Sequence, residues 1–353
     1  MTSKERVNLA LAHREADRVA IHDAPWGTTI ERWHREGLPQ NMTPADYFHF
    51  ELEGQWVEPS FRFPTETLEE TEEYTITRDG NGTVSKTWKH KESTPLWLDY
   101  TIKTPEAWHE HKPRLEWSSD YVDWEAAKAM QARCQENGRW FYYACAFGFN
   151  RFDIIVGGER LLMAMATDPD WVQDMFDTWA ELCCQILEDM IGHGLQFDGC
   201  FVYNDMGYRN ASLFSPAMFR RFEFPNHKKI YDCAKAHGLK CILHSCGCVK
   251  ELIPGLIEAG LACLQPLEVK AGMDLIELKQ QYGEVLAFMG GIDARKMAHP
   301  DPAVIEEEIR TKFAVAMPGG GYIFHSDHSI PDNVSFQQYQ HVIDLVHKYG
   351  KYR

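Results

Sequence analysis

From residue 139 onward, short apolar segments of strand-like composition alternate with segments that carry helical patterns and helix caps. Apolar runs of this length are typical of strands that are covered on both faces. Strands that alternate with helices require a parallel sheet, because each helix returns the chain to the same edge of the sheet. We predict strands at 140–148, 197–205, 239–247, 263–268, 285–293 and 321–329, and helices at 158–166, 168–194, 215–238, 248–260, 273–283, 301–317 and 333–350.

The same pattern begins near the N-terminus, where residues 17–25 predict a further strand. In a chain of 353 residues, this series favours a (β/α)8 barrel of the TIM type, in the α/β class, over an open doubly wound sheet. No G-x-G-x-x-G follows a predicted strand, so the dinucleotide-binding form of the open sheet lacks its fingerprint. The sequence therefore predicts a barrel.

Residues 1–138 are less regular than residues 139–353, although neither part contains a repeat, a low-complexity tract or a Ser/Gly linker. We therefore expect one domain over residues 1–353, in which 1–138 hold the first barrel unit and an irregular elaboration. Regular β/α units would follow from 139 to 353. The elaboration consists of a predicted hairpin at 73–90, around Asp79-Gly80-Asn81-Gly82, and predicted helices at 104–115 and 119–138.

Composition excludes several classes of protein. A net charge of −16 disfavours binding to nucleic acid or to an anionic membrane, because both need a basic face. No apolar run approaches the roughly 18–20 residues that span a bilayer, and the N-terminus lacks the apolar region of a signal peptide. The ten cysteines are scattered, mostly within apolar runs, so we expect free thiols in a cytoplasmic protein.

Polar side chains stand at the end of nearly every predicted strand. In (β/α)8 enzymes the reacting side chains come from the carboxyl ends of the strands. A single such residue has an ordinary explanation, since polar side chains also cap the helix that follows. A series of them around one barrel predicts a shared active-site rim. They are His22 and Asp23, Asn204 and Asp205, His244 and Cys246, Glu268, Asp293, and Asp327 and His328.

The stretch "LHSCGC" (243–248) contains the most specific candidates. Residues two apart in a strand point to the same side, so His244 and Cys246 should project together toward the barrel mouth. Imidazole and thiolate are preferred zinc ligands, and a catalytic zinc takes three protein ligands. We predict His328 as the third ligand, with Glu268 and Cys248 as alternatives. A redox role is less favoured, because C-x-C without a thioredoxin-like pattern is no redox motif.

The other rim residues divide into two predicted groups. Asp205, Glu268 and Asp293 are the predicted catalytic residues, since carboxylates can orient a substrate or complete a metal shell. Asp293 also has a structural explanation, as the cap of the loop that leads to the next helix. The predicted substrate-binding residues are His22, Tyr203, Asn204 and Phe147.

The C-terminal two-thirds of the chain resembles the uroporphyrinogen decarboxylase superfamily, which also contains zinc-dependent methyltransferases that act with corrinoid proteins. The resembling stretches match in order and spacing, and the resemblance implies a (β/α)8 barrel. They are "FDGCFVYNDMGYRNASLFSPAMFRRFEFPNHKKIYDCAKAHG", "ILHSCGCVKELIPGLIEAG", "LQPLEVKAGMDLIELKQQYG", "FMGGID" and "GGGYIFHSDHSIPDNVSFQQY".

Within this superfamily, the methyltransferase branch is the better match. The decarboxylases carry an arginine-rich "RQAGR"-type stretch, whereas the comparable region here, "DAPWGTTIERWHREGLP", has Arg32 and Arg35 without the motif. The methyltransferases carry an H-x-C pair, which His244 and Cys246 match. Their later zinc-binding cysteine is replaced here by His328, and the decarboxylases also keep a histidine near this position.

The resemblance implies a zinc-dependent methyltransferase that moves a methyl group between a corrinoid and a small thiol or oxygen substrate. No D-x-H-x-x-G corrinoid-binding stretch occurs in the chain, so the corrinoid would arrive on a separate protein. A homodimer is an expectation from the resemblance alone. Two alternatives remain open: a metal-independent decarboxylase of a tetrapyrrole or another carboxylate, and a corrinoid- or tetrapyrrole-binding protein without turnover.

Overall fold

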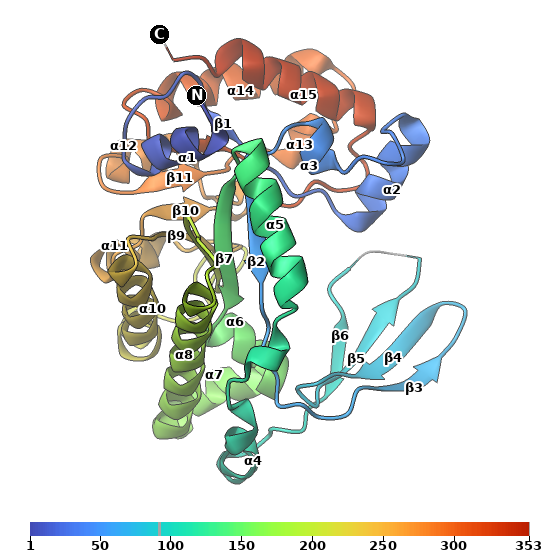
Figure 1. Ribbon diagram of the computed structural model, residues 1–353, viewed down its shortest axis with the longest axis vertical. Coiled ribbons are helices and arrows are strands. Elements are labelled where there is room, and N and C mark those ends of the chain that lie inside the picture. The colour runs from blue at the N-terminus through green and yellow to red at the C-terminus, as the bar shows by residue number, and fades with distance from the viewer. Residues whose placement is uncertain (91–92, 353) are drawn as a thin grey trace.

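The computed structural model of the chain describes residues 1–90 and 93–352. Eight parallel strands form one curled sheet, in which they follow one another in chain order (Figure 1). The last strand pairs with the first, and the N–H of Glu51 donates to the carbonyl oxygen of Ile21 at 2.8 Å between the first and second strands. The fold is therefore the predicted (β/α)8 barrel. Its strands are β1 (Ala20–Ile21), β2 (Leu52–Trp56), β7 (Trp140–Ala146), β8 (Gly199–Tyr203), β9 (Lys240–His244), β10 (Cys263–Gln265), β11 (Ala287–Met289) and β12 (Tyr322–Phe324).

Helices cover the outer face of the sheet (Figure 1). Several begin where a side chain caps the first backbone N–H groups, as Asp274 does for α12 (Leu275–Tyr282) and Ser335 does for α15 (Phe336–Tyr349). Within the described residues, no helix has the length and apolar character needed to cross a bilayer. Further helices are α2 (Gly27–Glu36), α3 (Pro44–Tyr47), α5 (Trp124–Asn137), α6 (Gly148–Phe152), α7 (Gly158–Thr167), α8 (Pro169–Gly192), α9 (Pro216–Met218), α10 (Phe224–Ala236), α11 (Ile253–Ala259), α13 (Ala294–Met297) and α14 (Pro302–Ala316).

The inside of the barrel is packed with side chains. Leu52, Phe201, Ile242 and Met289 belong to a buried cluster inside the barrel, and helix α1 (Ser3–Leu11) adds apolar side chains to the same cluster. Helix α1 contacts β1, β7 and β12 and covers the amino ends of the strands. Since the interior is filled and one end is covered, a ligand can reach the barrel only at the carboxyl ends of the strands.

The sequence analysis predicted seven of the eight barrel strands and missed β2. Residues 1–138 therefore contain two barrel strands instead of one. The sequence of β2, LEGQW, has no apolar run, because a barrel strand with a partly exposed face needs none. Gly54 is required by packing, since a Cβ there would lie 2.1 Å from the Tyr142 ring. The predicted strands are also too long at their carboxyl ends. The segment 263–268, for example, ends as a strand at Gln265.

A small antiparallel sheet follows β2 and projects from the barrel (Figure 1). The predicted hairpin at 73–90 forms its centre, and Asp79 Oδ1 accepts the N–H groups of Asn81 and Thr83, both at 2.9 Å, in the turn. The Thr83 hydroxyl donates to the carbonyl oxygen of Ile154 at 2.9 Å, which holds this turn against the segment after β7. The sheet consists of β3 (Glu66–Glu70), β4 (Tyr74–Arg78), β5 (Val84–Trp88) and β6 (Leu96–Asp99), and α4 (Pro105–His111) follows it.

Candidate functional site

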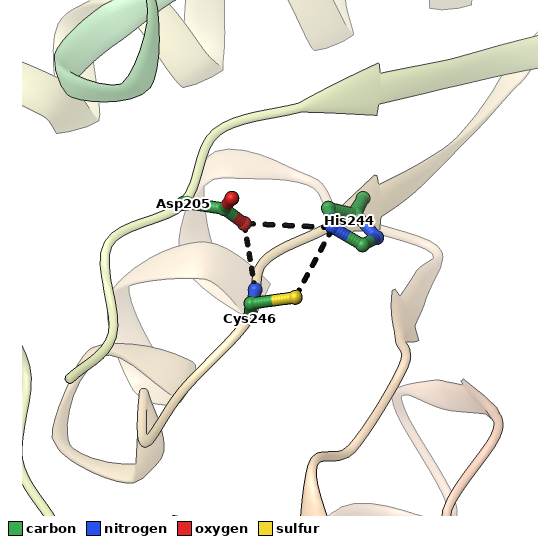
Figure 2. Close-up of side chains that lie close together, drawn as sticks. All are labelled: Asp205, His244 and Cys246. Carbon is green, nitrogen blue, oxygen red and sulfur yellow. Dashed lines mark hydrogen bonds and ion pairs between the residues drawn. The ribbon is translucent and has the colours of Figure 1, made fainter. Parts of the chain in front are cut away.

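The end of β9 and the segments that follow β8 and β9 bring three candidate ligands together at the carboxyl end of the barrel, as Figure 2 shows. They are Asp205, His244 and Cys246, and one ligand atom from each lies within 4.8 Å of the others. His244 Nε2 is 3.4 Å from Cys246 Sγ and 3.5 Å from Asp205 Oδ1. The structure therefore places His244 and Cys246 side by side, and Asp205 joins them.

Close contact between two glycines shapes these segments. Gly247 has a φ of +76°, and a Cβ there would lie 2.4 Å from the carbonyl carbon of Gly207. Beside this contact, the N–H of Cys248 donates to the carbonyl oxygen of Tyr208 at 2.7 Å. The N–H of Cys246 also donates to Asp205 Oδ1 at 2.7 Å. Because only glycine leaves this space and readily adopts this φ, the two segments lie close enough to hold the three candidate ligands together.

We expect Gly247→Ala to lower the free energy of unfolding by about 2–4 kcal/mol, through backbone strain and overlap with Gly207. Gly238→Ala is the matched control, because Gly238 has a φ of +74° and a Cβ there would meet no described atom within 4 Å. Gly238→Ala introduces backbone strain without an overlap, so it should lower the free energy of unfolding by only about 1 kcal/mol. Urea unfolding of both variants measures the difference, and equal losses would contradict the role of the close contact.

The Cys246 thiol is largely buried. Burial raises its pKa to about 11, although a hydrogen bond with His328 acts in the opposite direction. The same hydrogen bond raises the pKa of His328 above its ordinary value, against the effect of burial. The thiol is therefore protonated at neutral pH, and a metal ion that binds its sulfur must displace that proton.

His328 contacts Cys246 but does not belong to the group of mutually close ligand atoms found among the described residues. Glu268 is buried, with an exposed fraction of 8%. Its carboxylate accepts the N–H of Gly247 at 2.7 Å and pairs with Lys270 at 3.0 Å. Glu268 thus holds the backbone that carries Cys246. The roles predicted for His328 and Glu268 remain predictions.

A cleft of about 520 Å³ opens beside Cys246. Cys246 therefore borders a space that could hold a small substrate. Cationic side chains contribute to its wall, although the whole chain is strongly acidic. Its lining residues are Gly207, Tyr208, Arg209, Cys246, Gly247, Glu268, Lys270, Ala271 and Arg295.

Comparison with known sequences identifies the family. The sequence profile of the uroporphyrinogen decarboxylase (URO-D) family matches residues 152–349, which is more than half of the chain and includes Asp205, His244, Cys246 and His328. The chain belongs to the uroporphyrinogen decarboxylase family. No curated protein sequence matches it.

Comparison with solved structures supports the fold of this uroporphyrinogen decarboxylase family member. A methyltransferase from Methanosarcina mazei is similar over 99% of both chains, with a TM-score of 0.69 and 15% identity. A B12-independent methionine synthase from Shewanella sp. W3-18-1 covers 80% of this chain and 72% of its own, with a TM-score of 0.41 and 10% identity. The first similarity supports the barrel fold over the full length of the chain.

The predicted substrate-binding residues are placed differently from one another. Tyr203 lies at the site, with its ring 5.1 Å from the ring of His244. Phe147 has no exposed surface and packs edge-on against His227, so it lies in the barrel wall. The His22 ring lies beside the rings of Phe50 and His325, and burial lowers its pKa to about 3. Of these three residues, only Tyr203 touches the candidate ligands.

Asp293 is committed to local structure. It caps α13 by accepting the N–H of Arg295 at 2.9 Å, and it forms an ion pair with the Arg295 side chain at 2.7 Å. Burial raises its pKa, but the hydrogen bonds from Arg295 outweigh burial and lower the pKa overall. The capping role considered for Asp293 in the sequence analysis therefore explains its contacts. A catalytic role remains a prediction.

Asn204 lies behind the site, fully buried, where it joins β8 to α6 and α10. Its Nδ2 donates to Glu223 Oε2 at 2.9 Å, and its Oδ1 accepts the N–H of Asn150 at 3.1 Å. Glu223 Oε1 accepts the N–H of Phe149 at 2.7 Å. Two side chains thus satisfy the first N–H groups of α6 in place of an N-cap. Asn204 therefore supports the wall next to Asp205.

The Glu223 carboxyl should make stability depend on pH, because burial raises its pKa from 4.5 to about 7. A raised folded-state pKa favours folding below pH 4.5, and this contribution is lost as the pH rises through 7. Glu223→Gln should therefore gain stability relative to the unmodified protein by about 3 kcal/mol over that interval. Urea unfolding of both proteins from pH 4.5 to 8 measures this, and a constant difference would contradict it.

Three residues near the site escaped the sequence analysis. Gln265 is the last residue of β10, His325 directly follows β12, and Gln265 contacts the ring of His244. Asp153 lies at the start of the segment that leads to α7, where burial and the nearby charge of Asp205 raise its pKa. Pro266 was a usable signal for Gln265, because proline cannot continue a strand ladder and so marks residue 265 as its end.

Proposed function

We propose that the chain is a zinc-dependent methyltransferase that moves a methyl group between a corrinoid on a separate protein and a small thiol or oxygen substrate. The observation that carries the proposal is the group of Asp205, His244 and Cys246 at the barrel mouth, with ligand atoms within 4.8 Å of one another. The methyltransferase from Methanosarcina mazei has the same fold over its full length, and the proposal extends its named activity to this chain.

The donor set fits zinc. It offers an imidazole nitrogen, a thiol sulfur and a carboxylate oxygen, all of which bind zinc, and three protein ligands are the number found in catalytic sites. In our proposal His244 and Cys246 hold the ion, and Asp205 supplies the third donor in the observed arrangement. His328, which contacts Cys246, is the alternative third ligand. When bound, zinc would lower the pKa of a substrate thiol or polarise a substrate oxygen.

The surrounding side chains would position the substrate. The cleft beside Cys246 admits a small molecule, and Lys270 and Arg295 stand at its wall. The ring of Tyr203 packs on the ring of His244 and so limits its movement. Glu268 holds the N–H of Gly247 and thereby the direction of the Cys246 side chain. Together these residues would orient the substrate sulfur or oxygen toward a methyl group presented from outside the barrel.

The decarboxylase alternative needs cations that can neutralise a substrate with many carboxylates. Arg32 lies in the region where the decarboxylases carry their arginine-rich stretch. Its side chain is engaged elsewhere, since it pairs with Glu36 at 2.6 Å and donates to the carbonyl oxygen of Asp332 at 2.6 Å. This placement favours the methyltransferase.

The test is methyl transfer from free methylcobalamin to a panel of thiols, with protein that has been loaded with zinc. We expect thiol-dependent loss of the methylcobalamin absorbance and formation of the methyl thioether. The S–CH3 bond forms, the cobalt–carbon bond breaks with its electron pair left on cobalt, and the thiol proton goes to solvent. Decarboxylation of a porphyrinogen, without transfer to any thiol or alcohol, would overturn the proposal.

A further inference from the structure

A chain of hydrogen bonds runs from His244, the last residue of β9, to buried side chains at the carboxyl ends of β10 and β12. His244 and Gln265 are cross-strand partners in β9 and β10, and Gln265 Oε1 contacts His244 Nδ1. Gln265 Nε2 lies 3.3 Å from His325 Nε2, and His325 Nδ1 lies 2.7 Å from the carbonyl oxygen of Ser326. Gln265 and His325 are both buried, with exposed fractions of 4% and 2%, so water does not compete for these bonds.

The order of donors and acceptors along this chain of hydrogen bonds is determined at His325, where the chain ends on a backbone carbonyl oxygen. A carbonyl oxygen can only accept, so the single proton of a neutral His325 belongs on Nδ1. His325 Nε2 must then accept, and the amide of Gln265 must donate to it. That orientation turns Gln265 Oε1 toward His244, where it can only accept. The proton of a neutral His244 therefore belongs on Nδ1, and Nε2 is left with its lone pair.

His325 and the neighbouring Ser326 are held in place by the buried carboxylate of Asp23. Asp23 Oδ1 lies 3.5 Å from His325 Nδ1, and the carboxylate accepts hydrogen bonds from the Ser326 hydroxyl and, at 2.9 Å, from the Tyr339 hydroxyl. Asp23 is almost fully buried, which keeps its partners fixed. The chain of contacts thus joins β9, β10 and the end of β12 to the residues after β1. The donor and the acceptor of each hydrogen bond in it are defined.

We propose that Gln265 is a positioning residue that, together with His325, fixes the tautomer of His244 so that Nε2 is the bare nitrogen that faces Cys246 and Asp205. The tautomer itself follows from the hydrogen bonds. Its purpose, metal binding through Nε2, rests on the proposed function. Hydrogen bonds to the second ring nitrogen are the general means by which proteins set the orientation of ligand histidines. The sequence analysis named neither Gln265 nor His325.

The first test needs no metal. Nitrogen-15 NMR of the metal-free protein with labelled histidine, at a pH where the ring is neutral, reports which nitrogen of His244 carries the proton. We expect Nδ1–H in the unmodified protein and in Gln265→Glu, which keeps an acceptor at this place. Gln265→Leu should show a changed proton distribution. Nε2–H in the unmodified protein, or an unchanged tautomer in Gln265→Leu, would overturn the inference.

The second test measures zinc affinity by competition with a chelator, and the absorption spectrum after loading with cobalt(II). Gln265→Leu should bind zinc about 10–100-fold more weakly, whereas Gln265→Glu should retain most of the affinity. Equal affinity and an identical cobalt spectrum in Gln265→Leu would contradict the positioning role. An unmodified protein with the Nδ1–H tautomer that binds no zinc would instead overturn the proposed function and leave the tautomer assignment standing.

Discussion

Replacement of both His244 and Cys246 by alanine is expected to reduce the zinc content from about one ion per chain to none. The structure offers three mutually close donor atoms, and the double variant removes two of them. A single remaining carboxylate cannot hold zinc against buffer and chelator. Elemental analysis of purified protein, prepared without chelator and then loaded with zinc, measures the change. Methyl transfer to thiols should be lost in the same variant.

The control for this experiment is Cys248→Ala. Cys248 lies two residues from Cys246 and is partly exposed, but it lies outside the group of three ligand atoms. It should keep the full zinc content. Absence of zinc from the unmodified protein after loading would sink the metal mechanism and leave the decarboxylase alternative. Loss of zinc in Cys248→Ala instead would show that Cys248 is a zinc ligand.

Two further variants distinguish the candidates for the third ligand. Asp205→Asn removes a charged oxygen donor that lies 3.5 Å from His244 Nε2. His328→Asn removes the hydrogen-bond partner of the Cys246 thiol. The variant with the weaker zinc binding in chelator competition identifies the residue that completes the site.

The barrel was predictable from the sequence because its repeating unit is local. A buried parallel strand needs an apolar run, and the helix that follows needs a cap and an apolar stripe, so each unit shows itself within about thirty residues. Strand β2 escaped because LEGQW meets its neighbour through a glycine against an aromatic ring, and that contact depends on Tyr142, far along the chain.

The candidate site was predictable in part. His244 and Cys246 are two residues apart, so strand alternation was enough to place them together. Asp205 was predicted on the same rim because it ends the predicted strand at 197–205. The positions of Gln265 and His325 depend on which strand residue is last before the chain turns, and an apolar run does not show that. The sequence analysis extended β10 to Glu268 and therefore passed over Gln265, although Pro266 marked the end of the ladder.

Replacement of Glu51 by alanine is expected to lower the free energy of unfolding by about 3–5 kcal/mol, because it removes the buried carboxylate that Arg6, Arg18 and the Ile21 N–H share and leaves Arg6 with Asp17 alone. Glu51 is 1% exposed and forms ion pairs with Arg6 and, at 3.0 Å, with Arg18. It also accepts the N–H of Ile21, and its own N–H donates to the Ile21 carbonyl oxygen at 2.8 Å. One residue thus joins β1 to the start of β2, where the ring of strands closes.

The matched control is Glu181→Ala, which removes a carboxylate that pairs with Lys229 at 3.0 Å on the surface, where both side chains are about half exposed. Exposed pairs contribute about 0–1 kcal/mol, so this variant should unfold almost as the unmodified protein does. Urea unfolding of both variants gives the comparison. A Glu51→Ala loss no larger than the Glu181→Ala loss would mean that the backbone and the packed interior close the barrel without the buried charges. A loss several times larger would assign the closure between β1 and β2 to this carboxylate, because it binds the backbone of Ile21 and both arginines at once.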